Sequence, residues 1–259
     1  MQKAIIFLHI PKTAGQSVHR YLQQFFQPDE VCPARENFQL LPFPTAQLQQ
    51  FRLFSGHLDW SLLDAVHGPR FAFTILRDPI ERLLSFYFFL RTRASRMKKE
   101  ELLLPQHQGL KAALTLSPDS YFCDAPGHLR QFLDNHYDNF YTYYFAGRTF
   151  DARQKLKGAM LRNTAFNEKV LLDLALANMR VLDQVYTTEQ LDRLETRIEA
   201  ELGAAKPPVS LLSTRVNQGE GDFNSRLDKL RAIGATDRTF ERLRDFTKLD
   251  DAIWKQYSP

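Results

Sequence analysis

Twice within its first 90 residues, the chain passes from a short apolar stretch through a polar turn into an amphipathic helical pattern. The first apolar stretch covers residues 4–10 and breaks at residues 11–15. A short, continuously apolar run is typical of a buried parallel strand. After the break, apolar residues recur at i, i+3, i+4, i+7 and i+8, the spacing of one helix face: Val18, Tyr21, Leu22, Phe25 and Phe26. This beginning predicts a strand, a turn and a helix.

The second segment has the same order. Residues 70–76 predict a strand that ends at Arg77, and a helical pattern follows at once. Asp78 suits the N-cap of that helix, Pro79 its first position and Glu81 its third, where an acidic residue completes a capping pair. Two strand-to-helix turns of one type are therefore expected.

The rest of the chain continues the alternation. Weaker strand patterns cover residues 52–56 and 181–186, helical patterns cover 151–179 and 189–202, and two more helices are expected near the C-terminus. We interpret the less regular stretch 91–137 as an insertion or lid in a single domain that covers residues 1–259. Alternating strands and helices predict an α/β fold, with a central, mainly parallel sheet flanked by helices.

Composition sets outer limits on function. Hydrophobic residues make up 44% and charged residues 25% of the 259, as in a domain with a sizeable core. The net charge of +4 is too small to indicate nucleic-acid binding. No leader pattern precedes the first strand, and the longest apolar stretch, 83–90, is far below the ~18 residues of a membrane span. With two cysteines, Cys32 and Cys123, no disulfide scaffold is indicated, and we expect a cytoplasmic protein.

The turn after the first strand has the residue types of an anion site. Parallel α/β sheets bind ligands at the carboxyl ends of their strands. Here Lys12, Gly15 and two hydroxyl residues, Thr13 and Ser17, stand at the start of a helix, whose free N–H groups and dipole attract a phosphate-like group. This is not a Walker A loop, because the glycine follows the lysine. We predict an anion cradle; a tight turn with an exposed lysine is the alternative.

The second turn offers Arg77 and, eight positions later, Ser85. An arginine directly after a strand is suited to binding a phosphate group. In the alternative interpretation, Arg77 forms an ordinary ion pair and Ser85 is a helix residue without a specific role. If the two turns are neighbours in a parallel sheet, they would hold two phosphate-like groups of one ligand.

Both segments resemble cofactor motifs of the sulfotransferases. Residues 9–17 (HIPKTAGQS) are similar to the 5′-phosphosulfate loop, and residues 75–87 (ILRDPIERLLSFY) are similar to the 3′-phosphate motif. The closest resemblance is to the heparan sulfate 2-O-sulfotransferase-like group of carbohydrate sulfotransferases. Weaker similarity extends over residues 139–147, 188–189, 216–217 and 249–257. The resemblance implies a P-loop-like three-layer fold.

It also implies transfer of a sulfuryl group from 3′-phosphoadenosine 5′-phosphosulfate (PAPS) to an acceptor hydroxyl, without a metal, leaving adenosine 3′,5′-bisphosphate. Lys12 would stabilise the leaving group, and Arg77 and Ser85 would grip the 3′-phosphate. Lys12 would thereby also contact the cofactor, and backbone N–H groups of the loop would hold the 5′-phosphate: Thr13, Ala14, Gly15, Gln16 and Ser17. For the adenine, the resemblance offers the aromatic run 139–145 and the loop 215–219, which begins with Arg215.

His57 is the expected general base among the seven histidines. It ends the second predicted strand, at the edge where the sulfate should lie, and matches the catalytic histidine of the resembling group. That group often has another histidine two positions earlier, where this chain has Ser55. A structural histidine is the alternative.

The acceptor follows less directly from the residues. A carbohydrate is expected from the resemblance, and a lipid or a small metabolite is equally open. The basic run 91–99 would either receive an anionic acceptor or form a solvated helix face. Two other functions stay open: a P-loop-like nucleotide kinase or phosphotransferase, and a non-catalytic nucleotide- or glycan-binding protein. Metal-independent binding of PAPS in preference to ATP would separate the first of these from a sulfotransferase.

Overall fold

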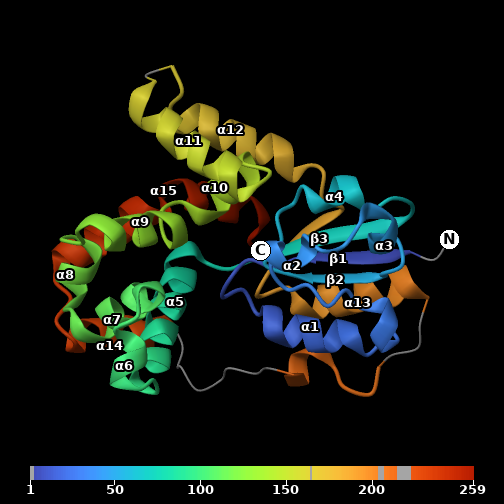
Figure 1. The fold of residues 1–259 in the computed structure, drawn as a ribbon, viewed down its shortest axis with the longest axis horizontal. Coiled ribbons are helices and arrows are strands. Elements are labelled where there is room, and N and C mark those ends of the chain that lie inside the picture. The colour runs from blue at the N-terminus through green and yellow to red at the C-terminus, as the bar shows by residue number, and fades with distance from the viewer. Residues whose placement is uncertain (1–2, 164, 204–206, 215–222) are drawn as a thin grey trace. The chain divides into compact units, whose positions relative to one another are not determined.

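The structure is a computed structural model that describes residues 3–163, 165–203, 207–214 and 223–259. The chain divides into two compact units (Figure 1). The sheet unit comprises Met1–Arg77, Tyr141–Val216 and Ile253–Pro259, and the helical unit comprises Asp78–Phe140 and Asn217–Ala252. The stretch 91–137 lies within the helical unit, and its role as an insertion or lid in a single domain stays a prediction.

A parallel four-stranded sheet forms the centre of the sheet unit. The strands are β1 (Ala4–Leu8), β2 (Leu53–Gly56), β3 (Arg70–Leu76) and β4 (Gln184–Thr187). Their order is β2-β1-β3-β4, and every neighbouring pair is parallel. The predicted α/β fold with a parallel sheet flanked by helices is confirmed. Because β1 lies between β2 and β3, the turns that follow these three strands meet at one edge of the sheet.

Two helices cover one face of this sheet, α1 (Gly15–Gln23) and α13 (Leu191–Leu202) (Figure 1). The predicted apolar face of α1 is buried there, in one cluster with apolar residues of all four strands. Phe7 on β1 and Phe73 on β3 stack in its middle, with ring centroids 5.0 Å apart. These residues are opposite one another in the β1–β3 register. The aromatic residues thus hold α1, and the turn before it, against the sheet.

The sheet unit contains further helices around the sheet. They are α2 (Asn37–Leu40), α3 (Thr45–Leu48), α4 (Leu62–Ala65), α10 (Phe140–Ala146), α11 (Phe150–Arg162) and α12 (Glu168–Met179). The first residue of α10 belongs to the helical unit, and the last turns of α15 (Asp237–Tyr257) belong to the sheet unit. Short 3₁₀ turns occur at Pro28–Glu30, Pro105–His107 and Leu211–Thr214.

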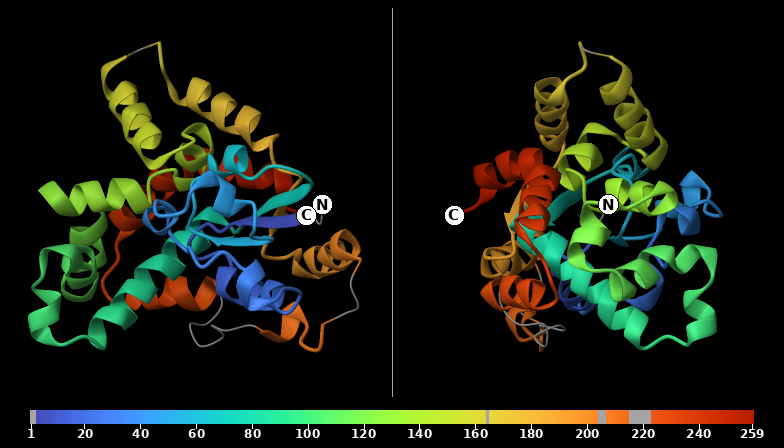
Figure 2. Two further views of the ribbon diagram at one scale, coloured as in Figure 1. Left: turned by 45° about the vertical axis from the view of Figure 1, so that its right-hand side comes forward. Right: turned by 90° about the vertical axis from the view of Figure 1, so that its left-hand side faces the viewer.

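The helical pattern over 151–179 forms two helices, α11 and α12, which are the arms of a hairpin (Figure 2). The side chains of Thr149 and Asn167 cap their N-termini by accepting backbone N–H bonds. A capping residue inside an otherwise helical pattern starts a new helix, because its side chain satisfies the free N–H groups of the next turn.

The helical unit is built around α5 (Pro79–Ser95). The predicted N-terminus is confirmed: Asp78 Oδ1 accepts a hydrogen bond from the Glu81 N–H at 2.8 Å, and Pro79 is the first helical residue. Buried apolar faces of several helices form one core here. The remaining helices are α6 (Lys99–Leu102), α7 (Gln108–Thr115), α8 (Pro118–Phe122), α9 (Gly127–His136), α14 (Phe223–Ala232) and α15 up to Ala252.

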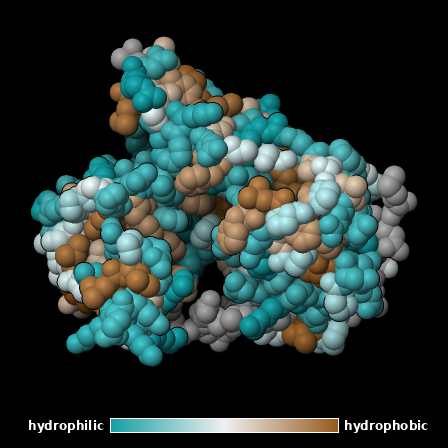
Figure 3. Space-filling model, in the orientation of Figure 1, coloured by the Kyte–Doolittle hydropathy of each residue, from teal (hydrophilic) through white to brown (hydrophobic). Residues whose placement is uncertain are grey.

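The face drawn in Figure 3 is mostly hydrophilic, with hydrophobic residues in separate patches. Large hydrophobic residues that are exposed belong to different elements, among them Phe38, Leu103 and Leu161. Within the described ranges, no helix combines the length and hydrophobicity that crossing a membrane requires.

The stacked Phe73 gives a test of this core. Phe73→Ala should lower the free energy of unfolding by about 3–5 kcal/mol, because it removes a fully buried ring and leaves a cavity. Phe38→Ala, at a residue that is 66% exposed, is the matched control and should change it by less than about 0.5 kcal/mol. Urea unfolding followed by circular dichroism measures both, and equal effects would contradict the assignment of the core.

Candidate active site

The turn between β1 and α1 has an unusual backbone. Lys12 has φ 74° and Ala14 has φ 64°, both in the left-handed region that residues other than glycine rarely adopt. Such strain persists where the surroundings enforce it, often at a ligand site. Left-handed residues in a turn direct successive N–H groups into a concave anion site, and here the turn leads directly into the N-terminus of α1. The backbone of this turn is thus suited to an anion, and its role as a phosphate cradle stays a prediction.

The ring of His9 packs against this turn. A Cβ atom at Gly15 would lie 1.7 Å from His9 Nε2, so the first residue of α1 must be glycine. His9 is 5% exposed, and its ring stacks on Phe7 with centroids 5.3 Å apart. Thr13 holds the turn from the other side, because its Oγ1 donates a hydrogen bond to the Ile10 carbonyl at 2.8 Å. The Thr13 hydroxyl therefore supports the turn itself.

His57 also packs against the His9 ring. The two rings stack with centroids 4.3 Å apart and an interplanar angle of 29°. His57 Nδ1 lies 2.8 Å from the His9 carbonyl oxygen. Because a carbonyl oxygen only accepts hydrogen bonds, Nδ1 carries the hydrogen, and Nε2 of the neutral ring keeps its lone pair. His57 is thus oriented as a proton acceptor at the carboxyl edge of β2.

Burial keeps this ring neutral. It lowers the pKa of His57 below the ordinary value, and Arg35 lowers it further, against the opposing effects of the His9 carbonyl and Glu36. Burial also puts the pKa of His9 well below its usual value, with His57, Arg35, His19 and Lys12 as further causes. For His19 on α1, burial and Arg35 lower the pKa to about 4. Near pH 7 all three imidazoles are therefore neutral.

Arg77 stands at the end of β3 and reaches the cradle. Its Nη1 donates to the Lys12 carbonyl at 3.4 Å. Tyr141, which is fully buried, fixes the Arg77 backbone by donating to its carbonyl at 2.8 Å and accepting from its N–H at 3.1 Å. The structure thus brings Arg77 and Lys12 together, as expected from two neighbouring turns.

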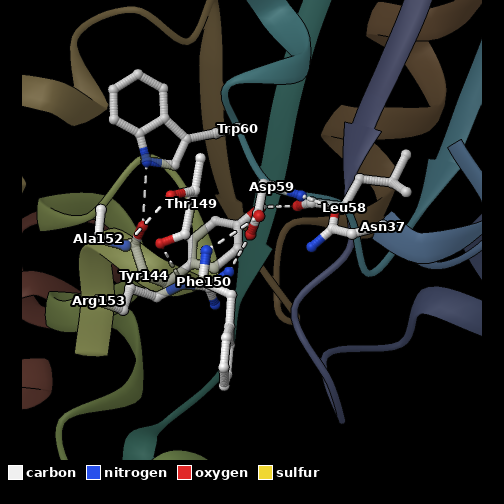
Figure 4. Close-up of polar contacts among 9 residues, drawn as sticks. All are labelled: Asn37, Leu58, Asp59, Trp60, Tyr144, Thr149, Phe150, Ala152 and Arg153. Atoms are coloured by element: carbon white, nitrogen blue, oxygen red, sulfur yellow. Dashed lines mark hydrogen bonds and ion pairs between the residues drawn. The ribbon is translucent and has the colours of Figure 1, made fainter. Parts of the chain in front are cut away.

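A polar network ties down the segment that follows His57 (Figure 4). Trp60 Nε1 donates to the Tyr144 carbonyl at 3.1 Å, and the Tyr144 hydroxyl donates to the Leu58 carbonyl at 2.5 Å. Between them, the Asp59 carboxylate pairs with Arg153 and accepts the Phe150 N–H. These contacts join the end of β2 to α10 and α11, so they limit movement of the backbone beside His57.

The other predicted residues have different outcomes. Gln16 is exposed and Ser17 buried in the first turn of α1. Ser85 is buried on α5 in the helical unit, and its pairing with Arg77 at a 3′-phosphate stays a prediction. Arg215 lies outside the described residues, as does the whole of the 215–219 loop.

The aromatic run 139–145 packs mainly as core. Its members from Tyr141 to Phe145 are at most 8% exposed. Their contact with an adenine stays a prediction.

Sequence reasoning missed the neighbours of His57. Arg35 lies next to it but belongs to no motif, and the Asp59–Arg153 pair joins residues 94 positions apart. The histidine at position 9 was visible in the first motif, yet its stacking on His57 depends on the pairing of β1 with β2. In the described part of the chain, no group of three or more His, Cys, Asp or Glu residues is arranged to hold a metal ion.

A family model described as the sulfotransferase family matches residues 1–170. The chain belongs to the sulfotransferase family. The match includes the 12–17 cradle, His57, Arg77 and Ser85, whereas Arg215 lies beyond it. A protein-tyrosine sulfotransferase of Arabidopsis thaliana is 33% identical over 91 residues, which are 34% of this chain and 18% of that protein. The chain thus matches less than a fifth of that relative's length.

The three neutral histidines make the stability of this family member depend on pH. In the unfolded chain each histidine has a pKa near 6.5. As the pH falls below about 6.5, the unfolded chain binds protons that the folded chain does not, so the free energy of unfolding should fall toward pH 5.

Urea unfolding at pH 7, 6 and 5 measures this effect. His19→Gln removes one of the groups and should make the decline shallower, whereas the exposed His67→Gln should leave the slope unchanged. Identical slopes for wild type and His19→Gln would show that the His19 pKa is not lowered by folding.

Proposed function

We propose that this protein transfers the sulfuryl group of PAPS to an acceptor hydroxyl. The observation that supports the proposal most is the position of His57: a neutral imidazole with its Nε2 lone pair available, stacked on the histidine that packs against the phosphate turn. Family membership supports the same reaction class.

The residues of the sheet unit fit the donor. The two left-handed residues, Lys12 and Ala14, form a turn suited to a phosphate group, and residues 12–17 would hold the 5′-phosphate at the start of α1. Arg77 would bind the 3′-phosphate, for which a planar guanidinium offers two parallel N–H groups. Ser85 and Arg215 remain proposed contacts to the donor. When bound, the donor supplies the sulfuryl group in an activated form.

His57 and Lys12 would then have different roles in the transfer step. His57 Nε2 takes the proton of the acceptor hydroxyl as that oxygen bonds to sulfur, in line with the breaking bond between sulfur and the phosphate oxygen. The Lys12 ammonium stabilises the negative charge that this phosphate oxygen acquires, and adenosine 3′,5′-bisphosphate leaves. No metal ion is required in this proposal.

A carbohydrate hydroxyl is the proposed acceptor, since the motifs are closest to those of carbohydrate sulfotransferases. A tyrosine hydroxyl is the second candidate, favoured by the relative from Arabidopsis thaliana. The enzyme is proposed to work in the cytoplasm, and both cysteines, Cys32 and Cys123, are free thiols, as in a reducing compartment.

His57→Ala should lower turnover by roughly 10² to 10⁴, the usual contribution of a general base, and leave the affinity for adenosine 3′,5′-bisphosphate unchanged. Radiolabelled PAPS with a panel of sugars and tyrosine peptides measures turnover, and calorimetry measures affinity. In wild type, kcat should rise with pH through a pKa below 6.5 and then level off. The control His67→Ala should resemble wild type; unchanged turnover in His57→Ala would remove the base assignment.

Arg77→Ala should weaken binding of adenosine 3′,5′-bisphosphate by about tenfold to a hundredfold, because a charge-assisted contact to phosphate is lost. Adenosine 5′-phosphate, which lacks the 3′-phosphate, should bind Arg77→Ala and wild type alike, and the exposed Arg20→Ala is the control. If Arg77→Ala lost the same affinity for both nucleotides, Arg77 would not contact the 3′-phosphate. Binding of ATP with Mg²⁺ in preference to PAPS would favour a kinase.

A further inference from the structure

Arg35 is a neighbour of the proposed base. Its carbonyl accepts the His57 N–H at 2.8 Å, and the next residue, Glu36, forms a parallel bridge with His57. A Cβ at Gly56 would lie 2.5 Å from the Arg35 carbonyl oxygen, so the two backbones approach closely. Arg35 therefore lies along the outer side of β2, at the same edge of the sheet as the cradle.

The Arg35 guanidinium has no counter-charge among the described residues. It forms no ion pair there, and its Nη1 is buried without a hydrogen-bond partner. Other partly buried arginines of the sheet unit do have carboxylate partners, such as Arg52 with Glu30 and Arg153 with Asp59. A desolvated charge without a partner is costly, so proteins normally pair it.

No described group next to Arg35 forms an ion pair with its guanidinium. His9, His19 and His57 interact electrostatically with it and are neutral imidazoles near pH 7. The adjacent Glu36 is exposed and forms no ion pair with Arg35 among the described residues. The positive charge at Arg35 is thus available to a bound anion.

A second donor near the base also lacks a partner. Ser55 is 2% exposed, and its Oγ is buried without a hydrogen-bond partner among the described residues. Ser55 is opposite Phe7 in the β1–β2 register and two positions before His57, so these side chains share the α1 face of the sheet. A hydroxyl and a guanidinium next to one imidazole suit a group with several negatively charged oxygens.

We propose that Arg35 binds an oxyanion beside His57. The inference rests on the proposed function, which puts the reacting hydroxyl at His57. Two groups with this chemistry come near the base: the sulfuryl group in transfer, and a carboxylate or sulfate of the acceptor. The planar fork of arginine binds either group with two parallel hydrogen bonds.

A binding experiment tests the proposal without turnover. Sodium sulfate is titrated calorimetrically into protein saturated with adenosine 3′,5′-bisphosphate, which has no sulfuryl group. Arg35→Met, which keeps the side chain's bulk and loses its charge, should bind sulfate at least tenfold more weakly than wild type. The control Arg20→Met should behave as wild type. In NMR titrations, sulfate should raise the pKa of His19 from about 4 in wild type and not in Arg35→Met.

Kinetics separate the two sources of the oxyanion. If Arg35 binds the sulfuryl group, Arg35→Met should lower kcat at least tenfold with every acceptor. If it binds an acidic group of the acceptor, Arg35→Met should raise KM at least tenfold for acidic acceptors and leave KM for neutral ones unchanged. Either result supports the proposal. If Arg35→Met does not fold, Arg35→Gln serves in both experiments.

Sulfate affinity, kcat and KM that are the same in Arg35→Met and wild type would overturn the proposal. Failure of the proposed function has a different signature: wild type would bind neither the bisphosphate nor PAPS, or would transfer no sulfuryl group to any acceptor. In the latter case the sulfate titration still decides whether Arg35 binds an oxyanion.

Discussion

The stacked pair of His9 and His57 joins the two halves of the candidate site. One face of the His9 ring packs on His57, and its edge fills the space that a side chain at Gly15 would occupy. Its backbone carbonyl fixes the tautomer of His57. A single residue therefore contacts the turn after β1 and also fixes the orientation of the His57 ring. This arrangement requires β1 and β2 to be adjacent and in register, which the parallel sheet provides.

Electrostatics follow from the same packing. Burial favours the neutral form of each imidazole, and the nearby cations Lys12 and Arg35 act in the same direction on His9. A site with neutral imidazoles and fixed cations favours anionic ligands. Its imidazoles keep a free lone pair near pH 7, because burial and the cations disfavour their charged form. The cost is sensitivity to acid, because the unfolded chain binds protons more tightly than these buried rings do.

The rest of the sheet unit limits movement around this pair. Tyr141 hydrogen-bonds to the backbone at the end of β3, and the Asp59–Arg153 ion pair holds the chain after β2. Both come from contacts with α10 and α11, which follow β2 and β3 by more than 60 residues. The helical unit has a separate core rich in aromatic residues, and Ser85 is buried on α5 in the same unit. Its first turn is determined locally by Asp78 and Pro79.

The sequence by itself determined the parallel α/β fold, the cradle after β1, the N-cap of α5 and the position of His57 at a strand end. These depend on contacts within a few residues: a continuous apolar run, a proline at a helix start, a glycine where helix and turn meet. Only the tertiary structure decided that His9 stacks on His57 and that the Tyr141 hydroxyl hydrogen-bonds to the Arg77 backbone. It also decided that Arg35 has no ion-pair partner among the described residues. Each of these joins residues separated by dozens of positions, or depends on every neighbour of a side chain at once. Such relations arise when the strands pair, because strand pairing sets which distant side chains meet.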